Sequence, residues 1–184
     1  GAVIEQVGKV DVVAFDKTGT LTHGQPIVQQ IIPLDGYQAD QILSLAASIE
    51  RGSEHPIGRS IVQAGIERQI ELVNVDGFAV LPGYGVTGHV GAQQIVIGNR
   101  ALLGERSILW TEEVDKQVQQ LELQGQTVIP IAVNGVLKGL ITLADTPRLE
   151  AKRAIAELKR IGIREVIMIT GDNPRTADRI AKEL

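Results

Sequence analysis

Residues 10–22 read VDVVAFDKTGTLT. The run from Val10 to Phe15 is apolar apart from Asp11, and a polar turn that contains glycine follows it at once. This pattern is typical of a buried strand in a parallel sheet that leads into a loop. Asp16 would then lie at the carboxyl end of that strand, where open α/β sheets bind their ligands.

A second stretch near the C-terminus repeats this design. Residues 165–173 read EVIMITGDN, an apolar run followed by a polar turn, and Pro174 can open a helix behind it. Between the two stretches, residues 147–161 carry apolar side chains at helical spacing. The two ends of the chain therefore predict a parallel α/β domain, with Thr170 and Asp172 at the sheet edge predicted for the first strand.

The middle of the chain predicts a different kind of structure. Helical periodicity recurs over residues 39–51, 57–69 and 111–123, and glycines separate β-rich segments at 73–80, 85–90 and 94–97. Asn134-Gly135 lies between two β-branched runs, which favours a type I′ hairpin turn. Antiparallel strands combined with helices indicate an α+β domain. We therefore expect an α+β domain inserted into the α/β domain.

The boundaries are expected at two short segments that contain proline or glycine. We assign residues 1–26 and 138–184 to the α/β domain and residues 27–137 to the insertion. The Gln25-Pro26 region and the stretch near Lys138-Gly139 are the expected hinge strands.

Composition excludes several classes of function. The 184 residues carry a net charge of -4, which gives no electrostatic reason to expect a nucleic acid as partner. There is no cysteine, so disulfides, thiolate metal sites and cysteine nucleophiles are excluded. No uncharged apolar run reaches the length of about 18 residues that a membrane-spanning helix needs.

Asp16 is a candidate nucleophile. A carboxylate at this position can attack an electrophile and become an acyl phosphate, with loop amides, Lys17 and Mg²⁺ offsetting the charge of the phosphoryl group. For a single aspartate, a plain turn after a strand is the simpler interpretation. The whole string from Asp16 to Thr22, however, resembles the phosphorylation signature of the P-type ATPases at every position. The string TGDN at 170–173 resembles the second motif of that family.

A third string, SEHP at 53–56, lies within the insertion. Pro56 restricts His55 to an extended conformation and can open a helix, so the imidazole can stack on or hydrogen-bond a base. Glu54 can accept a hydrogen bond from an exocyclic amine. A surface turn is the alternative interpretation. The string resembles that of the heavy-metal-transporting P-type ATPases, which implies that Glu54 and His55 bind the adenine of ATP.

Residues 82–88, PGYGVTG, contain a formal GxGxxG pattern. A dinucleotide fingerprint must open a helix, and the residues after this one favour a strand instead. Glycines let a ligand approach the backbone closely. The resemblance implies that Gly83 and Gly85 line the nucleotide pocket together with Gly98 and Asn99, for which a turn is the alternative.

The resemblance to the heavy-metal P-type ATPases extends over nearly the whole chain. It implies a haloacid dehalogenase-like phosphorylation domain that carries an inserted nucleotide-binding domain. It also implies transfer of the γ-phosphoryl group of ATP to Asp16, with Lys17, Thr18, Thr170 and Asp172 in the catalytic site. Asp16 and Thr18 would form part of a Mg²⁺ site. In the full protein the reaction would drive transport of a metal ion, with copper as the expected ion.

Thr18 separates two classes of enzyme that share this fold. Haloacid dehalogenase-like phosphatases carry a second aspartate two residues after the nucleophile, and it acts as general acid and base. A threonine cannot take this role, so we expect a longer-lived acyl phosphate. The alternatives to a transport ATPase are such a phosphatase and a nucleotide-binding module without catalysis.

Two interpretations of Asp145 remain open, because it can cap the following helix or correspond to an acidic position of the P-type phosphorylation domain. In that family the pattern continues beyond the position of Leu184 to residues that complete the Mg²⁺ site, and transmembrane and actuator domains complete the transporter. We therefore expect this chain to be part of such a protein, at the cytoplasmic face of a membrane. By itself it would bind ATP with little or no turnover.

Overall fold

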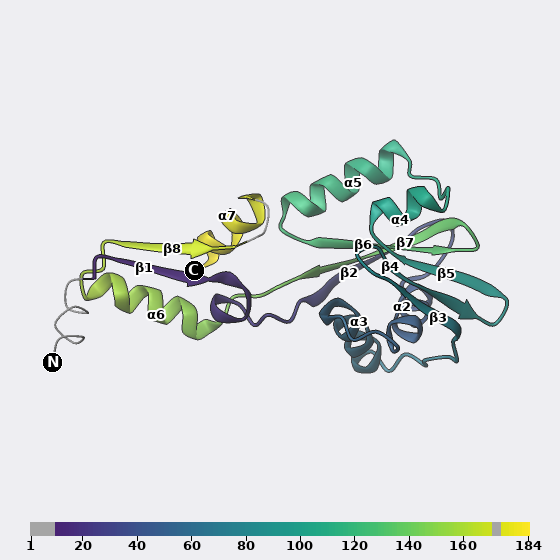
Figure 1. Ribbon diagram of the computed structural model, residues 1–184, viewed down its shortest axis with the longest axis horizontal. Coiled ribbons are helices and arrows are strands. Elements are labelled where there is room, and N and C mark those ends of the chain that lie inside the picture. Colours follow the sequence, from purple (N-terminus) through teal and green to yellow (C-terminus); the bar gives the residue numbers. More distant parts are fainter. Residues whose placement is uncertain (1–9, 171–173) are drawn as a thin grey trace. The chain divides into compact units, whose positions relative to one another are not determined.

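The computed structural model describes residues 10–170 and 174–184. The chain divides into two compact units (Figure 1). Unit 1 contains the chain up to Gln25 and again from Asp145 onward, and unit 2 is Pro26–Ala144. The structure thus confirms an α+β domain inserted into the sequence of an α/β domain.

Unit 2 is built on a six-stranded antiparallel sheet in the order β2-β7-β6-β5-β4-β3. Its strands are β2 (Ile27–Pro33), β3 (Asp76–Leu81), β4 (Gly85–Val90), β5 (Gln93–Gly98), β6 (Thr127–Val133) and β7 (Val136–Ala144). Asn134 and Gly135 join β6 to β7 with φ values of 49° and 77°. A type I′ turn requires positive φ at both of these positions, so the predicted hairpin is confirmed.

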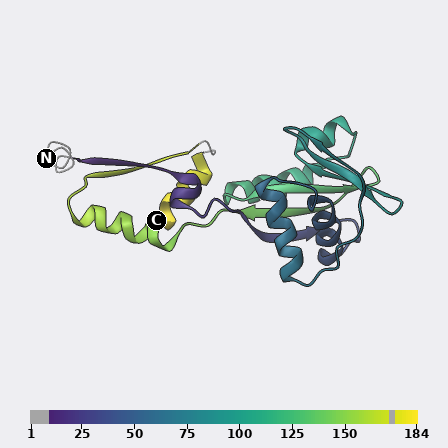
Figure 2. The ribbon, with the colours of Figure 1, turned by 60° about the horizontal axis from the view of Figure 1, so that its bottom comes forward.

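Two pairs of helices cover the two faces of this sheet (Figures 1 and 2). One face is covered by α2 (Ala39–Glu50) and α3 (Pro56–Glu67), and the other by α4 (Arg100–Glu105) and α5 (Glu112–Leu123). Alternation along the strands separates the two cores: Ile95 and Ile97 pack with α2, whereas Val96 packs with α4 and α5. Unit 2 is therefore a three-layer α/β/α structure.

The second expected boundary is wrong. Strand β7 runs through Lys138 and Gly139, and Gly139 pairs with Pro33 of β2 on one side and with Ile131 of β6 on the other. Lys138 is the extra residue at a register shift against β6, and its carbonyl accepts a hydrogen bond from the Leu34 amide at 2.8 Å. Unit 2 therefore extends to Ala144 instead of ending at residue 137. The sequence predicted a hinge at Lys138 and Gly139, but in the structure both residues contribute to packing. The Lys138 ammonium pairs with Asp35, and the missing side chain of Gly139 leaves room for Ile42.

Two elements of unit 2 were not predicted, namely β2 and α4. The β2 sequence, IVQQIIP, has apolar residues in adjacent pairs, so it lacks the alternation that marks a half-buried strand. It lies at the edge of the sheet, where its terminal Pro33 is tolerated. Helix α4 has only six residues, too few for a helical period to be recognised.

Unit 1 contains two parallel strands, β1 (Val12–Asp16) and β8 (Glu165–Ile169), with helices α6 (Leu149–Arg160) and α7 (Pro174–Glu183). Phe15, Val166 and Met168 pack against the core formed by Leu21 and α6. The other face of the strands is exposed among the described residues, since Val12, Ile167 and Ile169 are 38%, 41% and 59% accessible. The strands are therefore parallel, as predicted, but half-buried.

Within the described residues, no helix combines the length and the apolar character needed to cross a bilayer.

Candidate functional site

Asp16 is the last residue of β1, and a tight turn over Lys17–Leu21 follows it. Gly19 has a φ of 76°, a left-handed value that favours glycine, and the Thr22 amide closes the turn on the Lys17 carbonyl at 3.1 Å. The Asp16 carboxylate thus lies at the carboxyl edge of a parallel pair of strands, as the sequence predicts.

The residues of this turn differ in exposure. Asp16, Thr18 and Gly19 are exposed, whereas Lys17 is only 7% accessible. An incoming phosphoryl group can reach the carboxylate and the backbone of the turn. Because Lys17 is buried, its role in offsetting the charge of the phosphoryl group stays a prediction.

The second motif reaches the same edge. In the register of the two strands Asp16 is opposite Ile169, so Thr170 follows directly at the level of the Asp16 carboxylate. The structure therefore brings Asp16 and Thr170 to one edge of the sheet. Asp172 lies outside the described residues.

Oxygen donors at this edge suit Mg²⁺, which binds to one or two carboxylates and keeps several waters or substrate phosphate oxygens. Asp16 supplies one exposed carboxylate. Thr18, two positions later, is also exposed and carries oxygen atoms that a metal ion could bind. No group of three or more His, Cys, Asp or Glu side chains that could hold a metal occurs among the described residues. The residues present thus fit part of a magnesium site.

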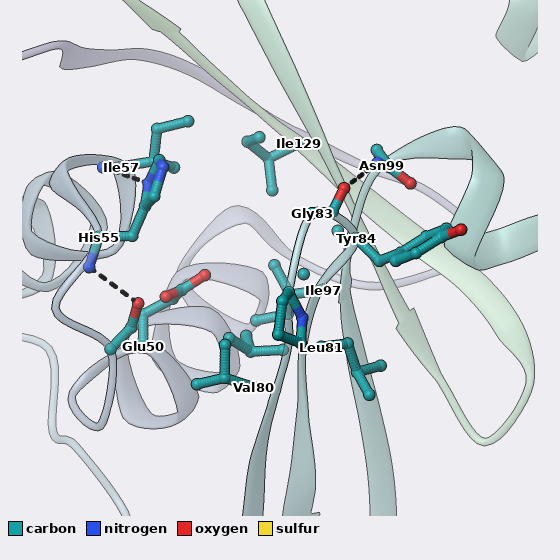
Figure 3. A pocket seen from close by; sticks show the side chains of 15 residues that line it. Glu50, His55, Ile57, Val80, Leu81, Gly83, Tyr84, Ile97, Asn99 and Ile129 are labelled. Carbon is teal, nitrogen blue, oxygen red and sulfur yellow. Dashed lines mark hydrogen bonds between the residues drawn. The ribbon is translucent and has the colours of Figure 1, made fainter.

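A cavity of about 320 Å³ opens in unit 2 between the α2–α3 connection and strands β3, β4 and β5 (Figure 3). Its lining includes five of the six predicted nucleotide-binding residues and more apolar side chains than polar ones. The lining residues are Glu50, Ser53, His55, Ile57, Val80, Leu81, Pro82, Gly83, Tyr84, Gly85, Val86, Ile97, Gly98, Asn99 and Ile129. The structure therefore brings five of those six residues together: His55, Gly83, Gly85, Gly98 and Asn99.

His55 caps helix α3 and lines the cavity at the same time. Its Nδ1 accepts a hydrogen bond from the Ile57 amide at 3.2 Å, and Pro56 occupies the first helical position. An imidazole that accepts at Nδ1 carries its proton on Nε2. The Nε2–H group therefore remains for a ligand, and the cap fixes the orientation of the ring.

Gly85 and Gly98 are opposite each other on β4 and β5, in the wall of the cavity. A Cβ on Gly85 would lie 2.1 Å from the Ile97 carbonyl oxygen, and a Cβ on Gly98 would lie 2.3 Å from the Tyr84 carbonyl oxygen. The backbones of the two strands thus lie too close together here for any residue other than glycine at these two positions.

Asn99 holds the glycine-rich turn in place. Its side-chain amide donates to the Gly83 carbonyl at 2.9 Å, and its side-chain oxygen accepts from the Leu102 amide at 3.0 Å as the cap of α4. Both ends of the side-chain amide are therefore engaged within the protein. In Figure 3 the Tyr84 ring points away from His55, so the backbone of this turn faces the cavity more than the aromatic ring does.

Glu54 is exposed and does not line the cavity, so the expected contact between Glu54 and a base is not supported. Glu50 lines the cavity instead and is only 6% accessible. Its carboxylate lies against the first turn of α3, where a Cβ on Gly58 would come within 2.4 Å of Oε2. One signal for Glu50 is present in the sequence. It continues the apolar register of Leu43 and Ala46, where a charged residue is out of place.

Burial raises the pKa of the Glu50 carboxyl above its ordinary value, and a hydrogen bond with Ser53 opposes part of this shift. The folded protein then holds a proton on Glu50 at pH values where the unfolded chain has lost it. Stability therefore falls as the pH rises from the ordinary carboxyl pKa through the raised one. Above this range the buried charge continues to destabilise unit 2.

Glu50→Gln removes this ionisation and is expected to increase the free energy of unfolding at pH 7 relative to the parent chain. The gain should shrink as the pH falls below the ordinary carboxyl pKa, because both side chains are then neutral. Urea unfolding at pH 7 and pH 4 measures the difference. The exposed neighbour serves as control, since Glu54→Gln should show no such gain. A Glu50→Gln gain that is equal at both pH values would contradict this account.

Comparisons with known proteins agree with the fold and the motifs. The family model of the haloacid dehalogenase-like hydrolases matches residues 10–184. The chain belongs to this family. The haloacid dehalogenase-like chain is 40% identical over its whole length to a copper-exporting P-type ATPase of Staphylococcus haemolyticus and 35% identical to one of Bacillus subtilis. It spans 22% and 23% of the lengths of these relatives.

Two solved structures of metal-transporting or CPx-type ATPases are similar to this haloacid dehalogenase-like chain over its whole length. A zinc-transporting PIB-type ATPase in the E2.Pi state has a TM-score of 0.84 and 36% identity, covering all of this chain and 29% of that protein. The catalytic domain of the CPx-ATPase CopB-B has a TM-score of 0.74 and 28% identity, covering all of this chain and 63% of that one. The predicted resemblance to heavy-metal P-type ATPases is therefore confirmed.

Proposed function

We propose that this chain is the nucleotide-binding and phosphorylation region of a heavy-metal-transporting P-type ATPase. Unit 2 binds ATP in the cavity beside His55, and Asp16 of unit 1 accepts the γ-phosphoryl group in the complete protein. The observation that carries this proposal is the cavity of unit 2, where His55, Glu50 and the Gly85–Gly98 pair converge.

The chemistry proposed for Asp16 is a single phosphoryl transfer. A carboxylate oxygen of Asp16 forms a bond to the γ-phosphorus while the bond from that phosphorus to the β–γ bridging oxygen breaks, and ADP leaves with the electron pair. Asp16 and Thr18 would form part of a site for Mg²⁺, which would neutralise charge on the phosphate oxygens. The exposed backbone of the turn at Gly19 supplies amide donors to the phosphoryl group.

The cavity of unit 2 suits the base of the nucleotide. None of the described residues that line it is Lys or Arg, so it offers no cation to the phosphates. Its apolar side chains suit the faces of a purine, and His55 Nε2 and the Glu50 carboxylate suit its polar edge. AMP should therefore bind to this chain within a few-fold of ATP.

The base should be adenine. A carboxylate accepts from the exocyclic amine of adenine, whereas guanine presents a carbonyl oxygen at that position and leaves the carboxylate without a donor. An unpaired buried polar group costs about 1–3 kcal/mol, so ATP should bind at least about fivefold more tightly than GTP.

Titration calorimetry of ATP and GTP against the chain tests this preference. Glu50→Gln should narrow it, because an amide can donate to the guanine oxygen. Glu54→Gln, which changes an exposed residue outside the cavity, should leave it unchanged. Equal affinities of the parent chain for ATP and GTP would overturn the assignment of Glu50.

In the complete protein, the partners proposed for this chain are the transmembrane and actuator domains, with the chain at the cytoplasmic face of the membrane. We propose copper as the transported ion, because the staphylococcal and Bacillus relatives are named copper exporters. Metal-stimulated ATPase activity of the full-length protein, compared for copper and zinc, tests this choice.

A further inference from the structure

The turn that carries Asp16 has an irregular backbone. Thr18 and Gly19 both have non-helical backbone angles, and the Thr22 amide donates a hydrogen bond to the Lys17 carbonyl at 3.1 Å. Phosphoryl transfer, however, needs the carboxylate and the neighbouring amides at fixed places around the phosphorus. Groups outside the turn that form hydrogen bonds with its backbone therefore help to keep its shape.

Those groups come from Asp145 to Arg148, a segment that follows unit 2 in the sequence. The Arg148 amide donates to the Leu21 carbonyl at 2.8 Å, and the His23 amide donates to the Thr146 carbonyl at 3.1 Å. The Thr22 hydroxyl, which is fully buried, bonds to the Asp145 carboxylate, 123 residues further along the chain. Residues 21–23, at the end of the turn, are thus hydrogen-bonded to residues 145–148.

The Arg148 side chain extends this pairing into the turn itself. Its Nε donates to the Thr22 carbonyl at 2.9 Å and its Nη2 to the Gly19 carbonyl at 3.3 Å. One planar guanidinium therefore holds two carbonyls, one inside the turn and one at its end. A lysine ammonium on its flexible stem does not reproduce this fork of donors.

The base of the Arg148 side chain is itself fixed. Arg148 is the residue immediately before α6, and Ala151 and Ile155 of that helix form a core with Leu21 of the turn. Helix α6 therefore fixes the backbone of Arg148 and also packs against the turn that the Arg148 guanidinium contacts.

We propose that Arg148 is a positioning residue for phosphoryl transfer to Asp16. This inference rests on the proposed function of Asp16. Arg148 contacts none of the reacting atoms and acts through the Gly19 and Thr22 carbonyls, which fix the backbone amides of the turn. It does not take part in nucleotide binding by unit 2.

The test measures the rate of phosphorylation of the full-length protein by γ-labelled ATP. Because a misplacement of about 1 Å can cost about 100-fold in rate, Arg148→Ala should lower the maximal rate by about 10- to 100-fold. The ATP concentration for half-maximal rate should stay unchanged, because the cavity of unit 2 is intact. Arg148→Lys should recover part of the rate, and thermal unfolding of each variant shows whether it is folded.

Arg153→Ala is the matched control, since it removes the same charge from an exposed position on the same helix. It should keep the full rate. A full rate for Arg148→Ala would overturn the role of Arg148 while leaving the proposed function standing. If Arg148→Ala does not fold, a full rate for Arg148→Lys would overturn it in the same way. Label that persists in Asp16→Asn would instead overturn the proposed function, and the inference with it.

Discussion

Gly85→Ala is expected to abolish nucleotide binding by this chain and to lower the free energy of unfolding of unit 2 by about 2–4 kcal/mol. The new methyl group would lie 2.1 Å from the Ile97 carbonyl oxygen and 2.5 Å from the Gly98 Cα. The Gly85 φ of 151° is also a value that residues with a side chain rarely adopt. Strands β4 and β5 must therefore separate at the point where they form the wall of the cavity.

Gly104→Ala is the matched control for this experiment. Gly104 lies in helix α4, and a Cβ there would meet no atom within 4 Å. Alanine in a helix interior is about 0.5–1 kcal/mol more favourable than glycine, so this variant should be as stable as the parent chain or slightly more stable. Its affinity for ATP should not change. Chemical unfolding and ATP titration of both variants measure the two effects, and a Gly85→Ala chain that binds ATP normally would refute the role given to the glycine pair.

The edge of the sheet in unit 1 was predictable because parallel strands place their carboxyl ends together. Two apolar runs, each followed by a polar turn, were enough to bring Asp16 and Thr170 to the same edge. The half-exposure of these strands was not predictable, since an apolar run does not reveal how many layers pack against it. The link between Arg148 and the turn was not predictable either, because it joins residues that are far apart in the sequence.

The cavity of unit 2 shows where a motif is insufficient. The SEHP motif correctly predicts that His55 lies in this cavity. Glu54 of the same motif, however, is exposed to solvent. The carboxylate that enters the cavity comes from Glu50, on the last turn of the preceding helix. Only the helical register of α2 connects Glu50 with the buried face, and this register was available in the sequence because the helix was predicted over residues 39–51.

The segment around Lys138 and Gly139 misled the assignment of the domain boundary for a related reason. A hinge was expected at these residues, yet the Lys138 ammonium pairs with Asp35 at the surface while the backbone continues through the sheet. Local composition reports on side chains, whereas the pairing of a strand depends on its neighbours on both sides.

The largest effect on affinity that a single side chain should produce is at His55. His55→Ala removes both the ring that lines the cavity and the cap of α3, whereas His55→Asn keeps a capping oxygen and removes only the ring. Both variants should therefore bind ATP at least about tenfold more weakly than the parent chain, a loss of about 1.4 kcal/mol. Only His55→Ala should also lose stability, by about 0.5–2 kcal/mol.

Asp16→Asn is the complementary variant, because it changes the proposed phosphoryl acceptor in unit 1 and leaves the cavity of unit 2 untouched. Calorimetric titration of ATP into the parent chain, His55→Asn and Asp16→Asn measures base binding separately from the acceptor. We predict a dissociation constant for Asp16→Asn within a few-fold of that of the parent chain and a tenfold or greater increase for His55→Asn. An affinity for ATP that is unaffected by His55→Asn would contradict the claim that unit 2 holds the nucleotide by its base.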